Sequence, residues 1–172
     1  MAAYASPRPL REDDNREPFD CGRESLNAWF KRNAWRNQAS NVTRTSVLID
    51  TAAGTIAGYI SLSAGQIERE ALAKADQRNR PTALPALLLG QLAIDRRHQG
   101  RGCARSLMLF ACRAAVRISE EIGCFGMITH PLDDDVRAFY AGFGFQDVPF
   151  DPRRAMIIRT ADLISNGLGA GD

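Results

Sequence analysis

One segment of the sequence constrains the fold more than any other, because a strand pattern, a glycine-containing turn and a helix pattern follow one another in it. Residues 87–94 are nearly all apolar, which is typical of a strand buried on both faces. The turn is residues 97–102 (RHQGRG). After it, apolar residues recur at helical spacing up to Gly123, and these are Cys103, Leu107, Phe110, Ala111, Ala114, Ala115 and Ile118. The sequence therefore predicts a strand–turn–helix unit.

This turn has the chemistry of an anion site. Gly100 and Gly102 permit a tight backbone and close approach of a ligand, and the start of the helix supplies free N–H groups and a positive dipole end. Arg97, Arg101 and Arg105 add positive charge, so a diphosphate is a suitable ligand. The segment is no Walker loop, and Arg105 stands where the third glycine of a dinucleotide fingerprint would fall. On spacing alone, an ordinary strand-to-helix loop remains an alternative.

The other patterns predict an α/β or α+β sandwich around one mixed sheet. Strands are expected at residues 4–10, 45–49, 55–66, 125–129, 143–148 and 155–158. Helices are expected after residues 20–22, within 68–82 and over 131–141. A chain of 172 residues with 45% hydrophobic residues suits a single domain, here residues 1–165, followed by a flexible glycine-rich tail, 166–172.

Composition excludes several classes. The four cysteines show no CxxC spacing, so we expect reduced thiols in the core and no metal site. No apolar run marks a secretory signal at the N-terminus. The longest apolar stretch, residues 83–94, is far short of the ~20 residues that a spanning helix needs. We therefore expect a cytoplasmic protein without membrane contact.

Three motifs resemble those of the GNAT N-acetyltransferases, and they follow one another along the chain as they do in that family. Arg97-x-x-Gly100-x-Gly102 resembles their acetyl-CoA pyrophosphate loop, residues 92–95 (LAID) resemble their fourth strand, and residues 138–145 (AFYAGFGF) match their FYxxxGF segment. The resemblance implies the GNAT fold, an α/β (α+β) domain with a single mixed, mostly antiparallel sheet flanked by helices. It also implies acetyl-CoA as cofactor, bound by Leu92, Ala93, Ile94, Arg97, His98, Gln99, Gly100, Arg101, Gly102, Cys103, Ala104, Arg105 and Tyr140.

Further segments over residues 8–163 are similar to the GNAT toxins of type II toxin–antitoxin systems. They include residues 20–22 (DCG), 43–45 (TRT), 88–93 (LLGQLA) and 151–152 (DP). The likeness implies acetylation of the α-amino group of aminoacyl-tRNA, which blocks translation, a ribbon–helix–helix antitoxin as partner, and a homodimer. Gln91 stands where many relatives carry Arg, which removes a charge near the expected active cleft.

A formal charge of +2, from 22 basic and 20 acidic residues, does not by itself indicate a nucleic-acid binder. However, residues 29–44 and 96–105 contain basic residues and no acid. Such segments neutralise phosphates, although a solvated helix face is the alternative. Trp35 is expected in the core rather than on a base. The candidate RNA or acceptor contacts are Lys31, Arg32, Arg36, Asn37, Arg44, Ser61 and Arg96.

The resemblance implies that Tyr140 is the general acid that protonates the departing CoA thiolate, and its alternative role is a core tyrosine beside Phe139 and Phe143. Backbone N–H groups of residues 92–94 are expected to polarise the thioester carbonyl. An α-amino group has a pKa of about 8 and needs no strong general base. His98 is expected to be exposed and not catalytic. Acetylation of a small amine or protein amino group, and a non-catalytic interaction module, are the competing functions.

Overall fold

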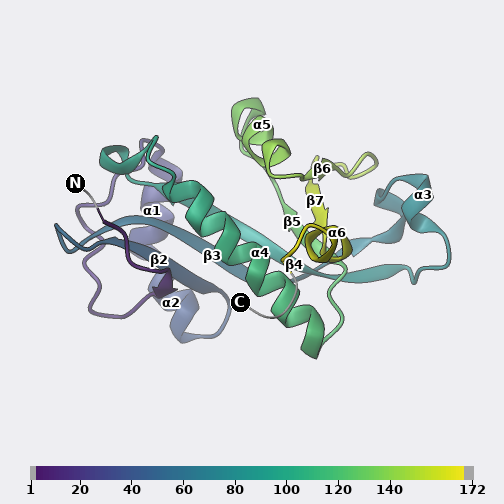
Figure 1. Cartoon of the computed structure of the whole chain (residues 1–172), viewed down its shortest axis with the longest axis horizontal. Coiled ribbons are helices and arrows are strands. Elements are labelled where there is room, and N and C mark those ends of the chain that lie inside the picture. The colour runs from purple at the N-terminus through teal and green to yellow at the C-terminus, as the bar shows by residue number, and fades with distance from the viewer. Residues whose placement is uncertain (1–2, 169–172) are drawn as a thin grey trace. The chain divides into compact units, whose positions relative to one another are not determined.

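The computed structural model describes residues 3–168 and contains seven strands in one sheet, in the order β1-β2-β3-β4-β5-β7-β6 (Figure 1). The strands are β1 (Arg8–Pro9), β2 (Arg44–Asp50), β3 (Thr55–Glu68), β4 (Ala83–Ile94), β5 (Gly126–Thr129), β6 (Gln146–Asp147) and β7 (Met156–Arg159). The helices are α1 (Glu24–Arg32), α2 (Ala34–Ala39), α3 (Lys74–Gln77), α4 (Cys103–Glu121), α5 (Asp134–Gly142) and α6 (Thr160–Ser165), with two short 3₁₀-helices, η1 (Arg69–Ala71) and η2 (Arg96–His98). The predicted α/β architecture with one mostly antiparallel sheet is confirmed.

Two compact units make up the chain. One comprises the residues up to Ser63 together with Leu89–Ala111, and the other comprises Ala64–Leu88 with the residues from Cys112 onward. The divisions fall within β3, β4 and α4. That residues 1–165 act as one domain stays a prediction.

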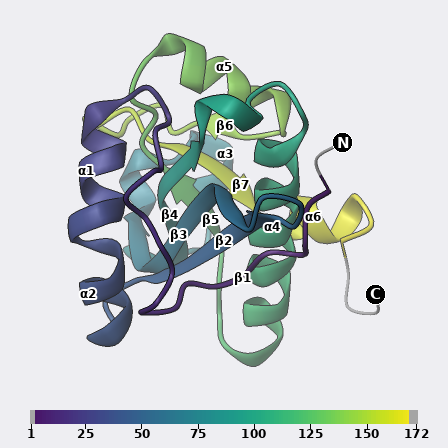
Figure 2. The ribbon, with the colours of Figure 1, turned by 90° about the vertical axis from the view of Figure 1, so that its left-hand side faces the viewer.

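The first unit is built around stacked aromatic rings. Phe30 of α1 lies flat on Tyr59 of β3 with ring centroids 4.1 Å apart, and Phe19 meets both rings edge-on. The Tyr59 hydroxyl donates to the Leu26 carbonyl at 2.8 Å, so its polar end is satisfied inside the core. Figure 2 shows α1 and α2 following one another beside the strands of this unit. Trp35 is half-buried against this core, as predicted.

The helix predicted after residues 20–22 is two helices, because α1 ends at Arg32 and Asn33 caps it, its N–H donating to the Trp29 carbonyl at 2.8 Å. Asn is a poor residue for a helix interior and a good one for a helix end. The apolar spacing alone does not reveal this break, since Leu26, Phe30 and Ala34 are buried on both sides of it.

In the second unit, β5 and β7 pair from Gly126↔Arg159 to Thr129↔Met156. Asp133 caps α5, its carboxylate accepting from the Val136 N–H at 2.8 Å. The prediction of a strand over residues 143–148 is confirmed only at β6 and is wrong for residues 143–145. The N–H groups of Phe143, Gly144 and Phe145 instead bond to carbonyls in the last turn of α5.

The end of the described chain is a helix that the sequence analysis did not identify. After α6, Gly167 takes a φ of +89°, and the Leu168 N–H donates to the Leu163 carbonyl at 3.1 Å, which closes the helix in a Schellman-type turn. Residues 169–172 lie outside the described residues, so the flexible tail stays a prediction.

The end of β4 is less buried than its apolar sequence predicts. The prediction that residues 87–94 are buried on both faces is wrong there, because Gly90 is exposed and Gln91, Leu92 and Ile94 are half-buried. Cys21, Cys103 and Cys112 are free and buried, as expected, and Cys124 is free and half-buried. Within residues 3–168, no helix has the length and apolar character required to cross a bilayer.

Two glycines of the second unit give a matched test of the β5–β7 packing. A Cβ on Gly126 would lie 2.6 Å from the Ile158 carbonyl oxygen, whereas a Cβ on Gly142, at the end of α5, would meet nothing within 4 Å. We expect Gly126→Ala to lower the free energy of unfolding by about 1–3 kcal/mol through overpacking. Gly142→Ala should raise it by up to about 1 kcal/mol by restricting the unfolded chain. Urea unfolding measures both, and equal effects would contradict the close strand contact.

Candidate functional site

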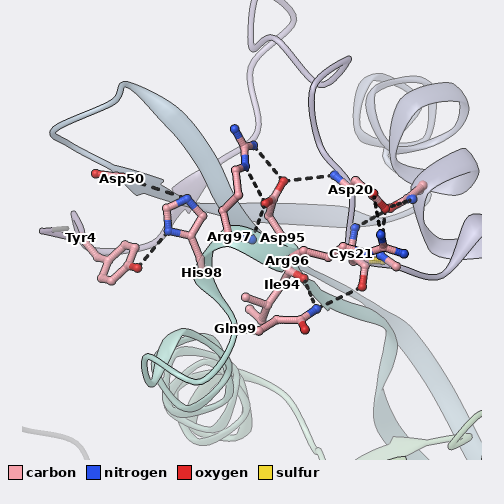
Figure 3. Close-up of polar contacts among 12 residues, drawn as sticks. Tyr4, Asp20, Cys21, Asp50, Ile94, Asp95, Arg96, Arg97, His98 and Gln99 are labelled. Carbon is pink, nitrogen blue, oxygen red and sulfur yellow. Dashed lines mark hydrogen bonds and ion pairs between the residues drawn. The ribbon is translucent and has the colours of Figure 1, made fainter. Parts of the chain in front are cut away.

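A buried carboxylate organises the turn between β4 and α4. Asp95 is 1% exposed, and its oxygens accept from the Arg97 N–H at 2.9 Å, Arg97 Nε at 2.8 Å, Arg97 Nη2 at 2.9 Å and the Asp20 N–H at 3.1 Å (Figure 3). Burial alone would raise the pKa of Asp95, but these donors outweigh it and hold the pKa at about 2. The guanidinium of Arg97 is therefore neutralised locally by an ion pair.

The turn is also tied to the segment that precedes α1. The Arg96 N–H donates to the Asp20 carbonyl at 2.8 Å, and the Gln99 amide donates to the Cys21 and Ile94 carbonyls, each at 3.0 Å (Figure 3). The Arg96 guanidinium lies 3.6 Å from the Asp20 carboxylate. These bonds fix the start of the turn before any ligand is present.

The structure corrects the expectation that His98 is exposed, because its imidazole is 5% exposed. The Nδ1 atom lies 3.0 Å from the Tyr4 hydroxyl, and Nε2 lies 3.9 Å from the Asp50 carboxylate (Figure 3). The cover comes from Tyr4, which is 94 positions away in the chain. Local sequence patterns carry no signal for such a partner.

The two glycines of the turn are required by the backbone rather than by crowding. Gly100 and Gly102 have φ values of +74° and +82°, and a Cβ on either would meet nothing within 4 Å. Within residues 3–168, the hydrogen bonds include none donated by the backbone N–H groups of Gly100, Arg101 or Gly102. These exposed amides lead directly into α4, a helix of 19 residues. Such a helix start binds an anion such as a diphosphate.

Burial divides the predicted cofactor residues into two groups. Gln99, Gly100, Arg101, Gly102 and Arg105 are exposed. The second group is buried or half-buried and consists of Leu92, Ala93, Ile94, His98, Cys103 and Ala104. A Cβ on Gly58 of β3 would lie 3.0 Å from the Ala93 carbonyl and 2.6 Å from Ile94 Cδ1, so glycine there permits close packing against the end of β4.

Tyr140 belongs to the second unit. It lies on α5, is 5% exposed, packs against Phe139 and Phe145, and forms a hydrogen bond with Thr129 of β5. Burial raises the pKa of Tyr140, and the bond to Thr129 offsets this only in part. The hydroxyl therefore keeps its proton at neutral pH, as a general acid requires.

The second unit also contains a pocket of about 500 Å³ that the sequence analysis did not identify, lined by residues that include His130, Asp151, Pro152 and Arg153. Arg153 Nη2 lies 2.9 Å from His130 Nε2, and since arginine only donates, the imidazole accepts and is neutral. Burial and the Arg153 charge both lower the pKa of His130. Because strand residues alternate, Ile128 and His130 face this pocket and Thr129 faces away from it.

The candidate RNA contacts fall in several places. Arg32 and Arg36 are exposed and Lys31 and Asn37 half-buried on α1 and α2, and Arg44 is exposed at the start of β2. Within the described part of the chain, no ion pair involves Lys31, Arg32, Arg36 or Arg44. Two other candidates differ, since Ser61 is 1% exposed and exposed Arg96 is paired with Asp20.

Comparison with known proteins shows the family. The model of the acetyltransferase (GNAT) domain matches residues 43–147. A tRNA-acetylating toxin of Mycobacterium tuberculosis is 31% identical over 158 residues, which cover 92% of this chain and 94% of that protein. The chain belongs to the GNAT family of acetyltransferases. The predicted family, its fold and its enzyme class are confirmed, and acetyl-CoA is the cofactor of this family.

Solved structures agree with this assignment. AtaT complexed with acetyl-methionyl-tRNAfMet has a TM-score of 0.88 and 27% identity, covering 95% of this chain and 99% of that chain. A Tyr→Phe variant of the toxin KacT also has a TM-score of 0.88, with 25% identity, covering 95% of this chain and 98% of that chain. The likeness thus extends over nearly the whole described fold.

The Asp95 contacts predict a pH-dependent stability. The pKa of Asp95 is lowered from 3.8 to about 2, so its contribution of about 2 kcal/mol is complete above pH 4 and is lost as pH falls toward 2. We expect Asp95→Asn to reduce the free energy of unfolding by about this amount at pH 7 and by much less at pH 2.5. Urea unfolding at the two pH values measures this difference. Asp13→Asn, at an exposed acid, is the control, and the same loss at both pH values for Asp95→Asn would refute the ion-pair role.

Proposed function

We propose that this GNAT enzyme is a toxin that transfers an acetyl group to the α-amino group of aminoacyl-tRNA and so blocks translation. The observation that carries the proposal is the 31% identity, over 92% of the chain, to a tRNA-acetylating toxin. The similarity to AtaT, which was captured with an acetylated methionyl-tRNA, supports the same acceptor class. Such a substrate is met in the cytoplasm, where we propose that the enzyme acts.

In this proposal the turn holds the diphosphate of acetyl-CoA. The donors are the backbone amides of Gly100, Arg101 and Gly102, with the positive end of α4 behind them. Arg101 and Arg105 add charge at exposed positions. Arg97 contributes indirectly, since its guanidinium is engaged by Asp95 and fixes the turn. The backbone of Leu92, Ala93 and Ile94 pairs with the pantetheine arm and polarises the carbonyl.

Acetyl-CoA supplies the acetyl group as a reactive thioester. An aminoacyl ester arrives with an amine pKa of about 8 or lower, so a fair fraction is already neutral and can attack. As the carbon–nitrogen bond forms and the carbon–sulfur bond breaks, Tyr140 gives its hydroxyl proton to the departing thiolate sulfur. The proton that the attacking nitrogen loses returns through solvent to the phenolate and restores the hydroxyl. The raised pKa of Tyr140 supports this role, because the hydroxyl is fully protonated at neutral pH.

The acceptor RNA is bound in this proposal by the basic residues of α1, α2 and the start of β2. Lys31, Arg32, Arg36 and Arg44 have no acidic partner within residues 3–168, so their charge is available for phosphates. Asn37 is assigned to the acceptor cleft with them, whereas Ser61 is buried and Arg96 is paired with Asp20. A ribbon–helix–helix antitoxin as the neutralising partner, and a homodimer, complete the proposal by the resemblance to type II toxins.

The decisive experiment is incubation of the purified protein with acetyl-CoA and total charged tRNA, followed by identification of N-acetylaminoacyl-tRNA. We expect acetylated product from one or a few tRNA species, and binding to tRNA that weakens steeply with salt. Transfer to a small amine or to protein amino termini, with no salt-dependent binding of tRNA, would reject the RNA substrate. Failure to bind acetyl-CoA would reject the enzyme and leave an interaction module.

The catalytic assignment predicts distinct effects for two buried tyrosines. Tyr140→Phe should fold normally and lose about 100-fold or more in turnover, because the proton donor is absent. The control is Tyr59→Phe, which removes a buried hydroxyl bonded to the Leu26 carbonyl and should affect stability only. Transfer of a labelled acetyl group measures both variants. Turnover of Tyr140→Phe equal to wild type would remove Tyr140 from the mechanism.

A further inference from the structure

The N-terminal segment is held against the end of β2. The Ala5 N–H donates to the Ile49 carbonyl at 3.1 Å, and the Thr51 N–H and hydroxyl donate to the Ala3 carbonyl at 2.8 Å and 2.9 Å. Tyr4 forms an isolated antiparallel bridge with Asp50. These bonds fix the backbone position of Tyr4, and with it the start of its side chain.

The Tyr4 side chain reaches the turn between β4 and α4. Its hydroxyl lies 3.0 Å from His98 Nδ1, and the two rings meet edge-on with centroids 5.7 Å apart (Figure 3). On the other side of the imidazole, Nε2 faces the Asp50 carboxylate at 3.9 Å. A carboxylate favours the tautomer that carries its proton on Nε2, so Nδ1 accepts the Tyr4 proton.

The same hydroxyl also lies close to the side chains on both sides of Gly102. These are Arg101 and Cys103, the first residue of α4. Since its proton goes to His98, the Tyr4 oxygen presents its lone pairs to the nearby Arg101 guanidinium. The hydroxyl thus ties the N-terminal segment to η2, next to the exposed amides.

We propose that Tyr4 is a positioning residue for the cofactor, acting through its hydrogen bond to His98 to hold the diphosphate turn in its binding shape. This inference rests on the proposed use of that turn for acetyl-CoA. Glycine loses more conformational freedom on ordering than any other residue, and the turn has two, Gly100 and Gly102. A contact that orders the turn beforehand lowers the entropic cost of binding.

The test replaces the three tyrosines one at a time by phenylalanine. Tyr4→Phe should weaken binding of acetyl-CoA about 3- to 10-fold, as expected for one hydrogen bond, and raise KM with kcat unchanged. Tyr140→Phe should lower kcat with little effect on binding. Tyr59→Phe, the matched control for loss of a buried hydroxyl, should lower Tm and leave the acetyl-CoA Kd unchanged. Calorimetry with acetyl-CoA and steady-state kinetics provide the readouts.

His98 variants test the route through the imidazole. Asn places an acceptor near the Nδ1 position, so His98→Asn should keep an affinity within about twofold of wild type, whereas His98→Gln should bind as weakly as Tyr4→Phe. The Tyr4→Phe, His98→Gln double variant should be no weaker than either single variant, because both remove the same contact.

Three outcomes overturn the proposal. They are a Tyr4→Phe Kd within twofold of wild type, a fall in kcat without a change in Kd, and additive losses in the double variant. Wild-type protein that does not bind acetyl-CoA would overturn the proposed function as well. Binding that is normal in both wild type and Tyr4→Phe would reject only the role of Tyr4.

Discussion

The architecture of the candidate site depends on the Asp95 carboxylate, which ends β4 and is almost completely shielded from solvent. A buried charge is tolerated only when donors surround it, and here the donors come from Arg97 and Asp20. The carboxylate thereby sets where the strand stops, shapes η2 and draws in the segment that leads to α1. Ion pairs of this kind contribute more to geometry than to net stability. The geometry is what a ligand-binding turn requires, because its amides must be in place before the ligand arrives.

Local patterns predicted the parts of the fold that depend on neighbouring residues. The strand–turn–helix unit, the strands β2 and β3 and the helix α5 all follow from spacing and residue type. Features set by distant partners were missed. His98 is buried because Tyr4 covers it from 94 positions away. The short β6 has a local cause that residue type alone did not reveal, since the preceding N–H groups complete the end of α5. In the site, the role of the glycines was predictable from the sequence, because a positive φ limits the residue type. The ion pair between Arg97 and Asp95 was not predicted.

Ion pairs that the sequence does not reveal change how the charge of the chain is interpreted. Two segments of the chain contain basic residues and no acid, but the structure separates paired from unpaired cations within them. In the turn, Arg96 and Arg97 face Asp20 and Asp95, while Arg101 and Arg105 form no ion pair within residues 3–168. The basic residues of α1 and α2 likewise have no acidic partner in the described chain. A cation already satisfied by a carboxylate contributes little to phosphate binding, so the unpaired set is the more informative one.

The three tyrosines show how surroundings divide one side chain among three roles. Tyr59 gives its proton to a backbone carbonyl, a fixed acceptor, and so the hydroxyl serves the core. Tyr4 donates to an imidazole and links the N-terminal segment to the turn. Tyr140 bonds to the side chain of Thr129, a hydroxyl that either donates or accepts, so its proton is not committed to one partner. Burial keeps this proton in place well above neutral pH, whereas the acceptor amine loses its own near pH 8. In the proposed mechanism the acid is therefore always loaded, and the protonation of the amine, rather than that of the enzyme, sets how the rate rises with pH.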